Sequence, residues 1–144
     1  MLRLPRDLYT EMVAHCLSDL PDEACGLLVG SYGGDEATQL FATANAAASA
    51  MVYEIDPKEM LRVDRAAQDL GADIMGVFHS HTHTDAYPSP TDVAKSFDPG
   101  WHYVLVSLRD TLPVVRSYLV REGTITEEPV EVPGLEIPGL DVAG

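Results

Sequence analysis

Residues 74–83 read IMGVFHSHTH, so a short apolar run passes directly into three alternating histidines. An apolar run of this length, Ile74–Phe78, is typical of a buried β-strand. Alternation along an extended chain predicts that the side chains of His79, His81 and His83 point to one side. Two of these imidazoles can chelate one metal ion. The stretch therefore predicts a buried strand that ends at a metal site.

The residues before this strand carry the signals of a helix. Asp56 is a cap acceptor, Pro57 occupies the first helical position, and Glu59 lies three residues after the cap. Gly71 supplies the left-handed residue that ends a helix. The apolar positions that share one face are Met60, Val63, Ala67 and Leu70. We therefore expect an amphipathic helix directly before the strand.

Outward from this unit, the chain alternates between strand and helix patterns. We expect a helix from Leu8 to Ser18, strands over 24–30 and 39–43, a loop over 45–50, strands over 103–108 and 114–120, and an edge strand over 125–132. This order predicts the α/β class, with helices packed on a mixed β-sheet in a single domain. We place the domain at residues 1–132 and a flexible, acidic, Pro/Gly-rich tail at residues 133–144.

Length and composition limit the classes of protein to consider. The 144 residues suit one domain, and the content of 46% hydrophobic and 22% charged residues argues against wholesale disorder. Because 9 Lys+Arg oppose 23 Asp+Glu, the formal charge is -14, which disfavours nucleic acid and anionic membranes as partners. No apolar run approaches the roughly 20 residues that span a bilayer, and the amino terminus lacks the core of a secretion signal, so we expect a cytoplasmic protein. Cys16 and Cys25 are too few for a disulfide framework or a four-cysteine zinc site.

A catalytic zinc site needs a third protein ligand besides two histidines. Asp92 is the leading candidate, because it follows His81 after ten residues and lies in the segment 88–92, where two prolines stiffen a turn into a short helix. The same residues fit a structural alternative, since Ser89 and Asp92 have the spacing of a helix cap that only holds backbone amides. Histidines clustered at a strand exit, where pockets form, favour the metal when the pieces are taken together.

The pattern His79-Ser80-His81, ten residues, then Asp92 within Pro-Ser-Pro-Thr-Asp resembles the zinc signature of the JAMM/MPN+ metalloproteases. The segment 21–30, PDEACGLLVG, is similar to the family segment whose glutamate opens a strand near the metal. The resemblance implies a JAMM/MPN-like fold, Zn²⁺ held by His79, His81 and Asp92, Glu23 as general base and Ser89 as the hydroxyl that helps to stabilise the oxyanion. Zinc lowers the pKa of bound water toward about 7, and a nearby carboxylate can then take its proton.

Within this family the chain is most similar to the short bacterial branch that cleaves ubiquitin-like sulfur-carrier proteins, in which threonine follows the second histidine as Thr82 does here. Residues 102–107 and 116–118 also resemble that branch. The implied reaction is hydrolysis of the amide between the terminal glycine of the carrier and a C-terminal cysteine, with release of cysteine. Two alternatives stay open: a general JAMM isopeptidase that acts on conjugates of ubiquitin-like proteins, and a non-catalytic MPN-type module that binds proteins. A DNA-associated relative ranks last because of the charge.

Several residues near these motifs receive structural interpretations. Cys25 is expected as a small buried side chain, with a thiol-dependent hydrolase as the alternative. We expect His83 to be exposed and not a ligand, and residues 84–87 to form a flexible loop over the site. Trp101 is expected to pack in the core or at its rim, and Asn45 to satisfy a local turn. Exposed sheet edges often pair, which allows a homodimer.

Overall fold

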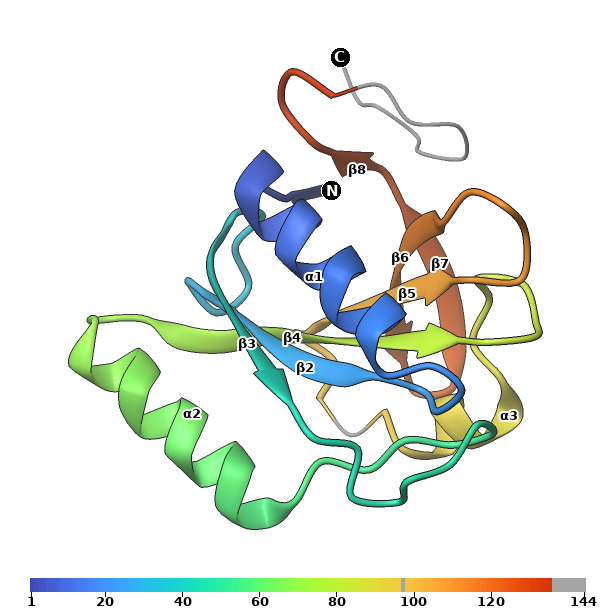
Figure 1. Ribbon diagram of the computed structural model, residues 1–144. Helices are drawn as coiled ribbons and strands as arrows, with labels where there is room; N and C mark the ends of the chain where they lie inside the picture. Colours follow the sequence, from blue (N-terminus) through green and yellow to red (C-terminus); the bar gives the residue numbers. More distant parts are fainter. Residues whose placement is uncertain (97, 136–144) are drawn as a thin grey trace.

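The computed structural model describes residues 1–96 and 98–135, which form a six-stranded sheet, a two-stranded sheet and three helices (Figure 1). The large sheet has the strand order β3-β2-β4-β5-β6-β7, and β1 pairs with β8 in the small one. The strands are β1 (Leu2–Arg3), β2 (Cys25–Gly30), β3 (Ala37–Thr43), β4 (Asp73–His81), β5 (His102–Ser107), β6 (Val114–Arg121), β7 (Thr124–Glu128) and β8 (Val130–Glu131). The helices are α1 (Arg6–Ser18), α2 (Pro57–Asp69) and α3 (Pro90–Ala94).

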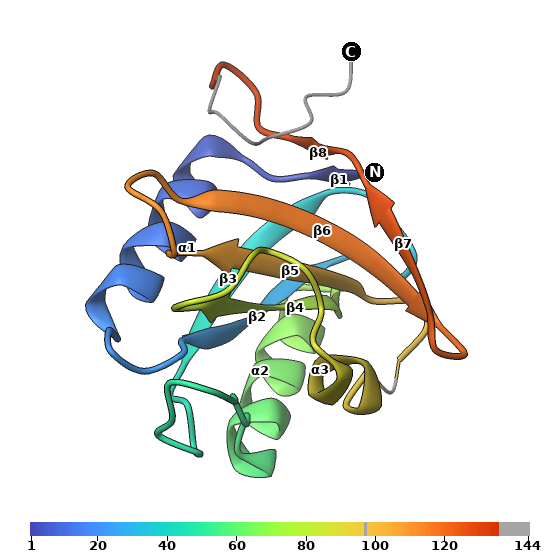
Figure 2. The ribbon, with the colours of Figure 1, turned by 90° about the vertical axis from the view of Figure 1, so that its right-hand side faces the viewer.

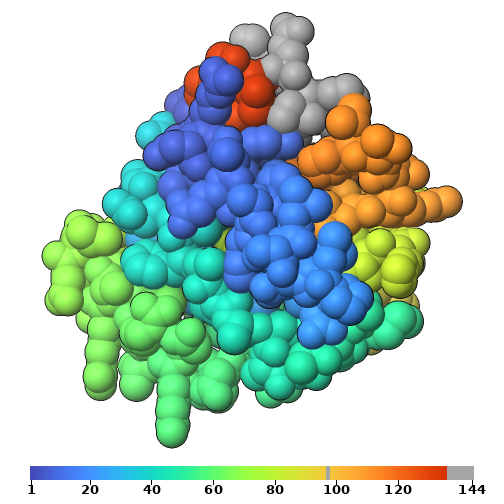
Figure 3. Space-filling model, in the orientation of Figure 1, coloured from blue at the N-terminus to red at the C-terminus, as the bar shows by residue number. Residues whose placement is uncertain are grey.

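Helices cover both faces of the large sheet. On one face, Met12 of α1 joins a buried cluster that includes Phe78 of β4. On the other, Val63 of α2 joins a second cluster that includes Val77 of the same strand. Figure 2 shows α1 on one side of the sheet and α2 with α3 on the other, and Figure 3 views the molecule from the side of α1. Every residue of β2 and β5 is buried, as strands covered on both faces require.

The strand β4 lies inside the sheet and positions the candidate site. It pairs antiparallel with β2 and parallel with β5, so the sheet is mixed and the predicted α/β class is confirmed. A parallel pair needs a crossover connection, which residues 82–101 supply with α3 inside it. This crossover brings Asp92 back to the last residues of β4.

Close packing between β2 and its neighbours depends on glycine at position 26. A Cβ atom on Gly26 would overlap the ring of Phe78 and lie 2.6 Å from the carbonyl oxygen of Phe41. The dense interior leaves no room for this atom unless a strand moves.

Most predicted elements are confirmed, including the helix that Asp56 caps by accepting a backbone N–H at 2.8 Å. Two details differ from the sequence prediction. Leu70 is 58% exposed, because it is the C-cap residue at which the helix has already ended. The segment 125–132 is not one edge strand, since β7 ends before Pro129 and β8 pairs with β1 instead. Proline has no N–H to donate to a ladder, which explains the break.

Among the described residues, no helix is long and apolar enough to cross a membrane. Leu135 packs against the cluster beneath α1. Residues 136–144 of the expected tail lie outside the described residues, so the flexible tail stays a prediction.

Candidate metal centre

The carboxyl end of β4 delivers two imidazoles into one buried space. His79 and His81 are each 4% exposed, and alternation along the strand places both on the face of Val77, which α2 covers. His81 Nδ1 lies 2.8 Å from the carbonyl oxygen of Asp85. This nitrogen therefore carries a proton and donates it to the carbonyl, which leaves Nε2 as the ligand atom.

The helix α3 brings a carboxylate to the same place. The Ser89 hydroxyl oxygen accepts the Asp92 N–H at 3.1 Å, and Asp92 Oδ2 accepts the Ser89 N–H at 2.9 Å. This reciprocal pair is a capping box, so the structural alternative for the motif is confirmed. The cap also fixes the Asp92 carboxylate beside the histidines, so the cap and a metal ligand are compatible roles.

Three potential ligand atoms converge at this point. Asp92 Oδ2 lies 3.2 Å from His79 Nε2 and 3.0 Å from His81 Nε2, and the two nitrogens are 3.2 Å apart. Ligands at about 2.0–2.1 Å from a tetrahedral zinc ion stand roughly 3.3 Å from one another. In the part of the chain that the structure describes, these three residues form the one group of this kind with all ligand atoms within 4.8 Å. The donor set and its spacing therefore fit a divalent cation such as zinc.

The protonation states of the three clustered side chains imply that metal binding releases a proton. Burial lowers the pKa of His79 and so favours its neutral, metal-binding form. Burial opposes ionisation of Asp92, but hydrogen bonds with His79 and His81 outweigh it and hold the pKa of this carboxyl far below its usual range. Burial also opposes the charged form of His81, yet the hydrogen bond with Asp92 outweighs it and raises the pKa of His81. A metal must therefore displace a proton that the cluster otherwise holds.

Glu23 lies just before β2 and faces this cluster as a buried acid. It is 5% exposed, and its Oε1 atom has no hydrogen-bond partner among the described residues. Burial raises the pKa of Glu23 to about 7, against a lowering effect of His81. A carboxyl with a pKa near neutrality can take a proton and return it during one reaction. Its separation from the histidines in sequence gives no local signal, so only the family resemblance could point to it.

Asn45 fixes the backbone around Glu23, a role that the sequence analysis missed because it expected only a local turn. Its Nδ2 donates to the carbonyl oxygens of Glu23 at 2.9 Å and Val52 at 3.0 Å, while its Oδ1 accepts the N–H groups of Ala47 and Glu54. The expected local turn is present, since Ala47 and Ala48 donate to the Asn45 side chain and carbonyl oxygen and Nδ2 lies 3.4 Å from the Ser49 carbonyl oxygen. The other bonds tie the entrance of β2 to the loop before α2.

Tyr53 and Lys95 are the other residues that sequence reasoning missed. The Tyr53 ring stacks on the His79 ring, with centroids 4.2 Å apart and an interplanar angle of 21°. Lys95 Nζ donates to the Tyr53 carbonyl oxygen at 2.8 Å and lies 5.7 Å from the centre of its ring. Neither residue belongs to a motif, so no pattern in the sequence singles them out.

The expectations for three further residues are confirmed. Cys25 is fully buried with its Sγ 3.5 Å from Thr43 Oγ1, and burial raises the pKa of its thiol, which disfavours a thiolate nucleophile. Trp101 is 7% exposed and packs in the cluster on the α2 side of the sheet. His83 is exposed, and because β4 ends at His81, the predicted alternation of three histidines holds for two of them.

The loop over 84–87, for which flexibility stays a prediction, makes hydrogen bonds to the sheet and to its flanking segment. The Ser107 hydroxyl donates to the Thr84 carbonyl oxygen at 2.6 Å, and Arg109 pairs with Asp85 at 2.7 Å. The Tyr118 hydroxyl donates to the carbonyl oxygen of residue 86. This anchoring holds the Asp85 carbonyl in place as the acceptor for the His81 ring.

Comparison with known proteins identifies the family. The family model for prokaryotic homologs of the JAB domain matches residues 5–120. The CysO-cysteine peptidase of Mycobacterium tuberculosis is 45% identical over 133 residues, which cover 92% of this chain and 91% of that protein. A probable TtuB-protein conjugate cleaving protease from Thermus thermophilus is 30% identical over 126 residues, or 85% of this chain and 78% of that protein. The solved structure of protein DSY2949 from Desulfitobacterium hafniense matches with a TM-score of 0.83 at 34% identity, covering 92% of each chain. The resemblance drawn from the histidine and aspartate spacing is thereby confirmed, and the chain belongs to the prokaryotic homologs of the JAB domain, as a JAMM-type metallopeptidase.

Proposed function

We propose that this chain hydrolyses the amide bond between the terminal glycine of a ubiquitin-like sulfur-carrier protein and a C-terminal cysteine, and so releases cysteine in the cytoplasm. The observation that carries the proposal is 45% identity to a CysO-cysteine peptidase over 92% of the chain. The convergence of His79, His81 and Asp92 beside the buried Glu23 supports it.

We assign the metal ligands as His79 Nε2, His81 Nε2 and Asp92 Oδ2, and the metal as Zn²⁺. When bound, zinc supplies Lewis acidity that activates water near neutral pH and polarises a carbonyl group. Two contacts hold the ligands in orientation: His81 Nδ1 donates to the Asp85 carbonyl oxygen, and the Ser89 N–H donates to the Asp92 carboxylate.

We assign Glu23 as the general base. Its Oε1 atom has no partner among the described residues, so it is available to accept a proton from the attacking water. The water oxygen forms the new bond to the glycine carbonyl carbon, and the bond from that carbon to the cysteine nitrogen breaks. Glu23 then gives its proton to the leaving nitrogen. The products are a carrier with a terminal carboxylate and free cysteine.

Ser89 is assigned a supporting role at the developing oxyanion. Its hydroxyl oxygen accepts the Asp92 N–H, so its own O–H proton remains available to donate. Removal of a comparable donor in another hydrolase costs about 3 to 4 kcal/mol of transition-state stabilisation.

Cleavage of isopeptide-linked conjugates of ubiquitin-like proteins is the second candidate, which the likeness to the Thermus protein favours. A non-catalytic protein-binding module is disfavoured, because the ligand atoms of three residues converge and Glu23 is present. In each case the partner is a small protein, and the charge of -14 disfavours nucleic acid and anionic membranes.

One assay separates these functions. The zinc-loaded protein is incubated with a sulfur carrier that bears a terminal cysteine, and separately with an isopeptide-linked dimer of a ubiquitin-like protein, each with and without a chelator. Intact mass should show loss of cysteine from the carrier and no loss with the chelator. Cleavage of the dimer alone would overturn the carrier assignment, and cleavage of neither would leave the binding module.

A further inference from the structure

A cavity beside the metal-ligand cluster contains a lysine that the proposed mechanism does not use. The cavity has a volume of about 470 Å³, and the residues that line it include Tyr53, Met60, Val77, Trp101, Tyr103 and Lys95. Its wall is continuous with the cluster, because the Tyr53 ring that lines it also stacks on His79. A group bound in this cavity would therefore lie on the Tyr53 side of the cluster, although none of the proposed metal ligands lines the cavity itself.

Lys95 is the C-cap residue of α3, and this position directs its side chain to the same side as Asp92. Lys95 follows Asp92 by three residues and keeps helical dihedral angles, with φ -91° and ψ -3°. Residues three apart on a helix are neighbours on its surface, with Cβ atoms about 5–6 Å apart. The contacts of Lys95 Nζ with the Tyr53 carbonyl oxygen and ring confirm this direction.

The Lys95 ammonium has donors to spare. It carries three N–H groups, of which the Tyr53 carbonyl oxygen accepts one. Glu54 also lines the cavity, but no ion pair joins it to Lys95 in the described part of the chain. The ammonium approaches the site from the Tyr53 side, because it lies 5.7 Å from the centre of the ring that stacks on His79. Lys95 thus places a positive charge at the edge of the site.

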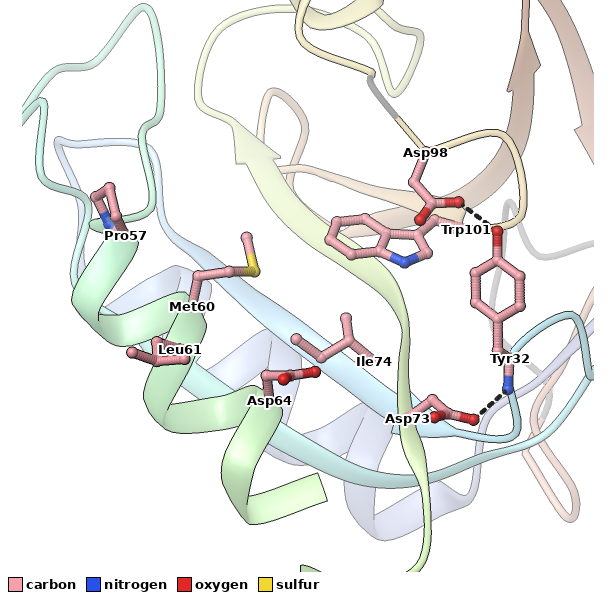
Figure 4. Close-up of a pocket in the computed structure, with 9 residues that line it drawn as sticks. All are labelled: Tyr32, Pro57, Met60, Leu61, Asp64, Asp73, Ile74, Asp98 and Trp101. Carbon is pink, nitrogen blue, oxygen red and sulfur yellow. Dashed lines mark hydrogen bonds between the residues drawn. The ribbon is translucent and has the colours of Figure 1, made fainter. Parts of the chain in front are cut away.

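An adjoining hollow is acidic and has no cation among the described residues that line it. It shares Met60 and Trp101 with the lysine cavity, but three carboxylates line it, those of Asp64, Asp73 and Asp98 (Figure 4). An anion would be repelled there and attracted at Lys95. The lysine cavity also contains the Glu54 carboxylate, so what distinguishes it from the acidic hollow is the Lys95 ammonium group, to which an anion could bind.

We propose that Lys95 is a specificity-determining residue that pairs with the free α-carboxylate of the residue released on hydrolysis. The inference rests on the proposed function and adds the group that recognises the single C-terminal residue beyond the scissile bond. In such a substrate one carbon atom separates the carboxylate from the scissile nitrogen, so the anion lies beside the cluster. The apolar rings of the cavity then receive a small side chain such as the thiol of cysteine. A lysine within an isopeptide conjugate lacks a carboxylate at this place.

The test compares two substrates that differ only in charge. A carrier that ends in Gly-Gly-Cys is prepared with a free α-carboxylate and with a terminal carboxamide, and kcat/KM is measured for both. Wild-type protein should prefer the carboxylate about tenfold, as one charge-assisted hydrogen bond predicts. Lys95→Met should lose this preference by slowing only the carboxylate substrate, and Lys95→Arg should restore most of it. Lys58→Met, which removes the other lysine, is the matched control and should keep the preference.

Binding gives a second measurement that does not depend on turnover. The Glu23→Gln protein loaded with zinc is titrated with Gly-Gly-Cys peptides that end in a carboxylate or in a carboxamide, with and without Lys95→Met. A carboxylate preference that disappears with Lys95→Met supports the inference. Equal affinity for both peptides in the protein that keeps Lys95 would overturn it. An equal loss of affinity for both peptides in Lys95→Met would also overturn it, because Lys95 would then act through its contact with Tyr53. Wild-type protein that cleaves neither carrier would overturn the proposed function instead, while the peptide affinities would still decide the role of Lys95.

Discussion

Replacement of Glu23 by glutamine should stabilise the metal-free protein at neutral and alkaline pH. Burial raises the pKa of the Glu23 carboxyl from 4.5 to about 7, whereas the unfolded chain ionises at the ordinary value. Between these pH values the unfolded state releases a proton that the folded state keeps, so the free energy of unfolding falls as pH rises. The pKa difference, 7 minus 4.5, corresponds to about 3 kcal/mol at about 1.4 kcal/mol for each pKa unit, and the full effect is present above pH 7.

Urea unfolding with a chelator present, at pH 4.5 and at pH 8, measures this effect without a contribution from bound metal. Relative to wild type, Glu23→Gln should gain about 3 kcal/mol more at pH 8 than at pH 4.5. Glu54→Gln removes an exposed carboxyl from a neighbouring loop and is the matched control, with no such gain. With zinc restored, Glu23→Gln should keep its metal and lose kcat by roughly 10²- to 10⁴-fold. A stability difference that is the same at both pH values would refute the reasoning.

Three further substitutions probe the elements around the site. Ser89→Ala should lower kcat more than zinc content and cost about 1 kcal/mol through the lost cap, whereas unchanged kcat would leave Ser89 as a helix cap alone. Gly26→Ala should reduce the free energy of unfolding by about 1 to 3 kcal/mol, because the new Cβ overlaps an aromatic ring of β4, and wild-type stability in urea would show that the strands can separate. Glu128→Ala should cost about 3 to 5 kcal/mol, because it leaves buried His102 without its carboxylate partner at 2.6 Å, while the exposed Glu127→Ala control should cost less than about 1 kcal/mol. Burial opposes the charged forms of both partners, but their hydrogen bond raises the pKa of His102 and lowers that of Glu128. The stability from this pair is therefore present between about pH 4.5 and pH 6.5, and it is lost as pH rises through the folded pKa of His102 or falls through that of Glu128. Urea unfolding across pH should show this loss in wild type and not in Glu128→Ala.

Local sequence patterns predicted the helices and strands whose ends and buried faces depend on their own residues alone. The cap at Asp56 and the apolar run before His79 indicated α2 and β4, and the structure confirms both. The last segment was misjudged because its apolar pattern continues past Pro129, while the partner strand changes there to β1. A change of partner depends on the path of the whole chain, which periodicity does not report.

The same distinction applies to the candidate site, where some residues have a local spacing in the sequence and others are brought together only by the fold. His79, His81 and Asp92 were predictable because one strand and one capped helix fix their spacing within a short stretch of sequence. Glu23 needed the family resemblance, since the β2–β4 pairing and not a spacing brings it near. Asn45 contributes through bonds to distant backbone atoms that a sequence pattern does not reveal.

The short helix in the crossover between β4 and β5 has a consequence for how such an enzyme can be redesigned. It carries Asp92, and Lys95 follows three positions later as its C-cap residue. Any movement of this helix that makes room for a bulkier departing group also pulls Asp92 away from the histidines. We therefore expect substrate selectivity to change more readily when the side chain at position 95 is replaced and the backbone stays in place than when the crossover is lengthened or shifted.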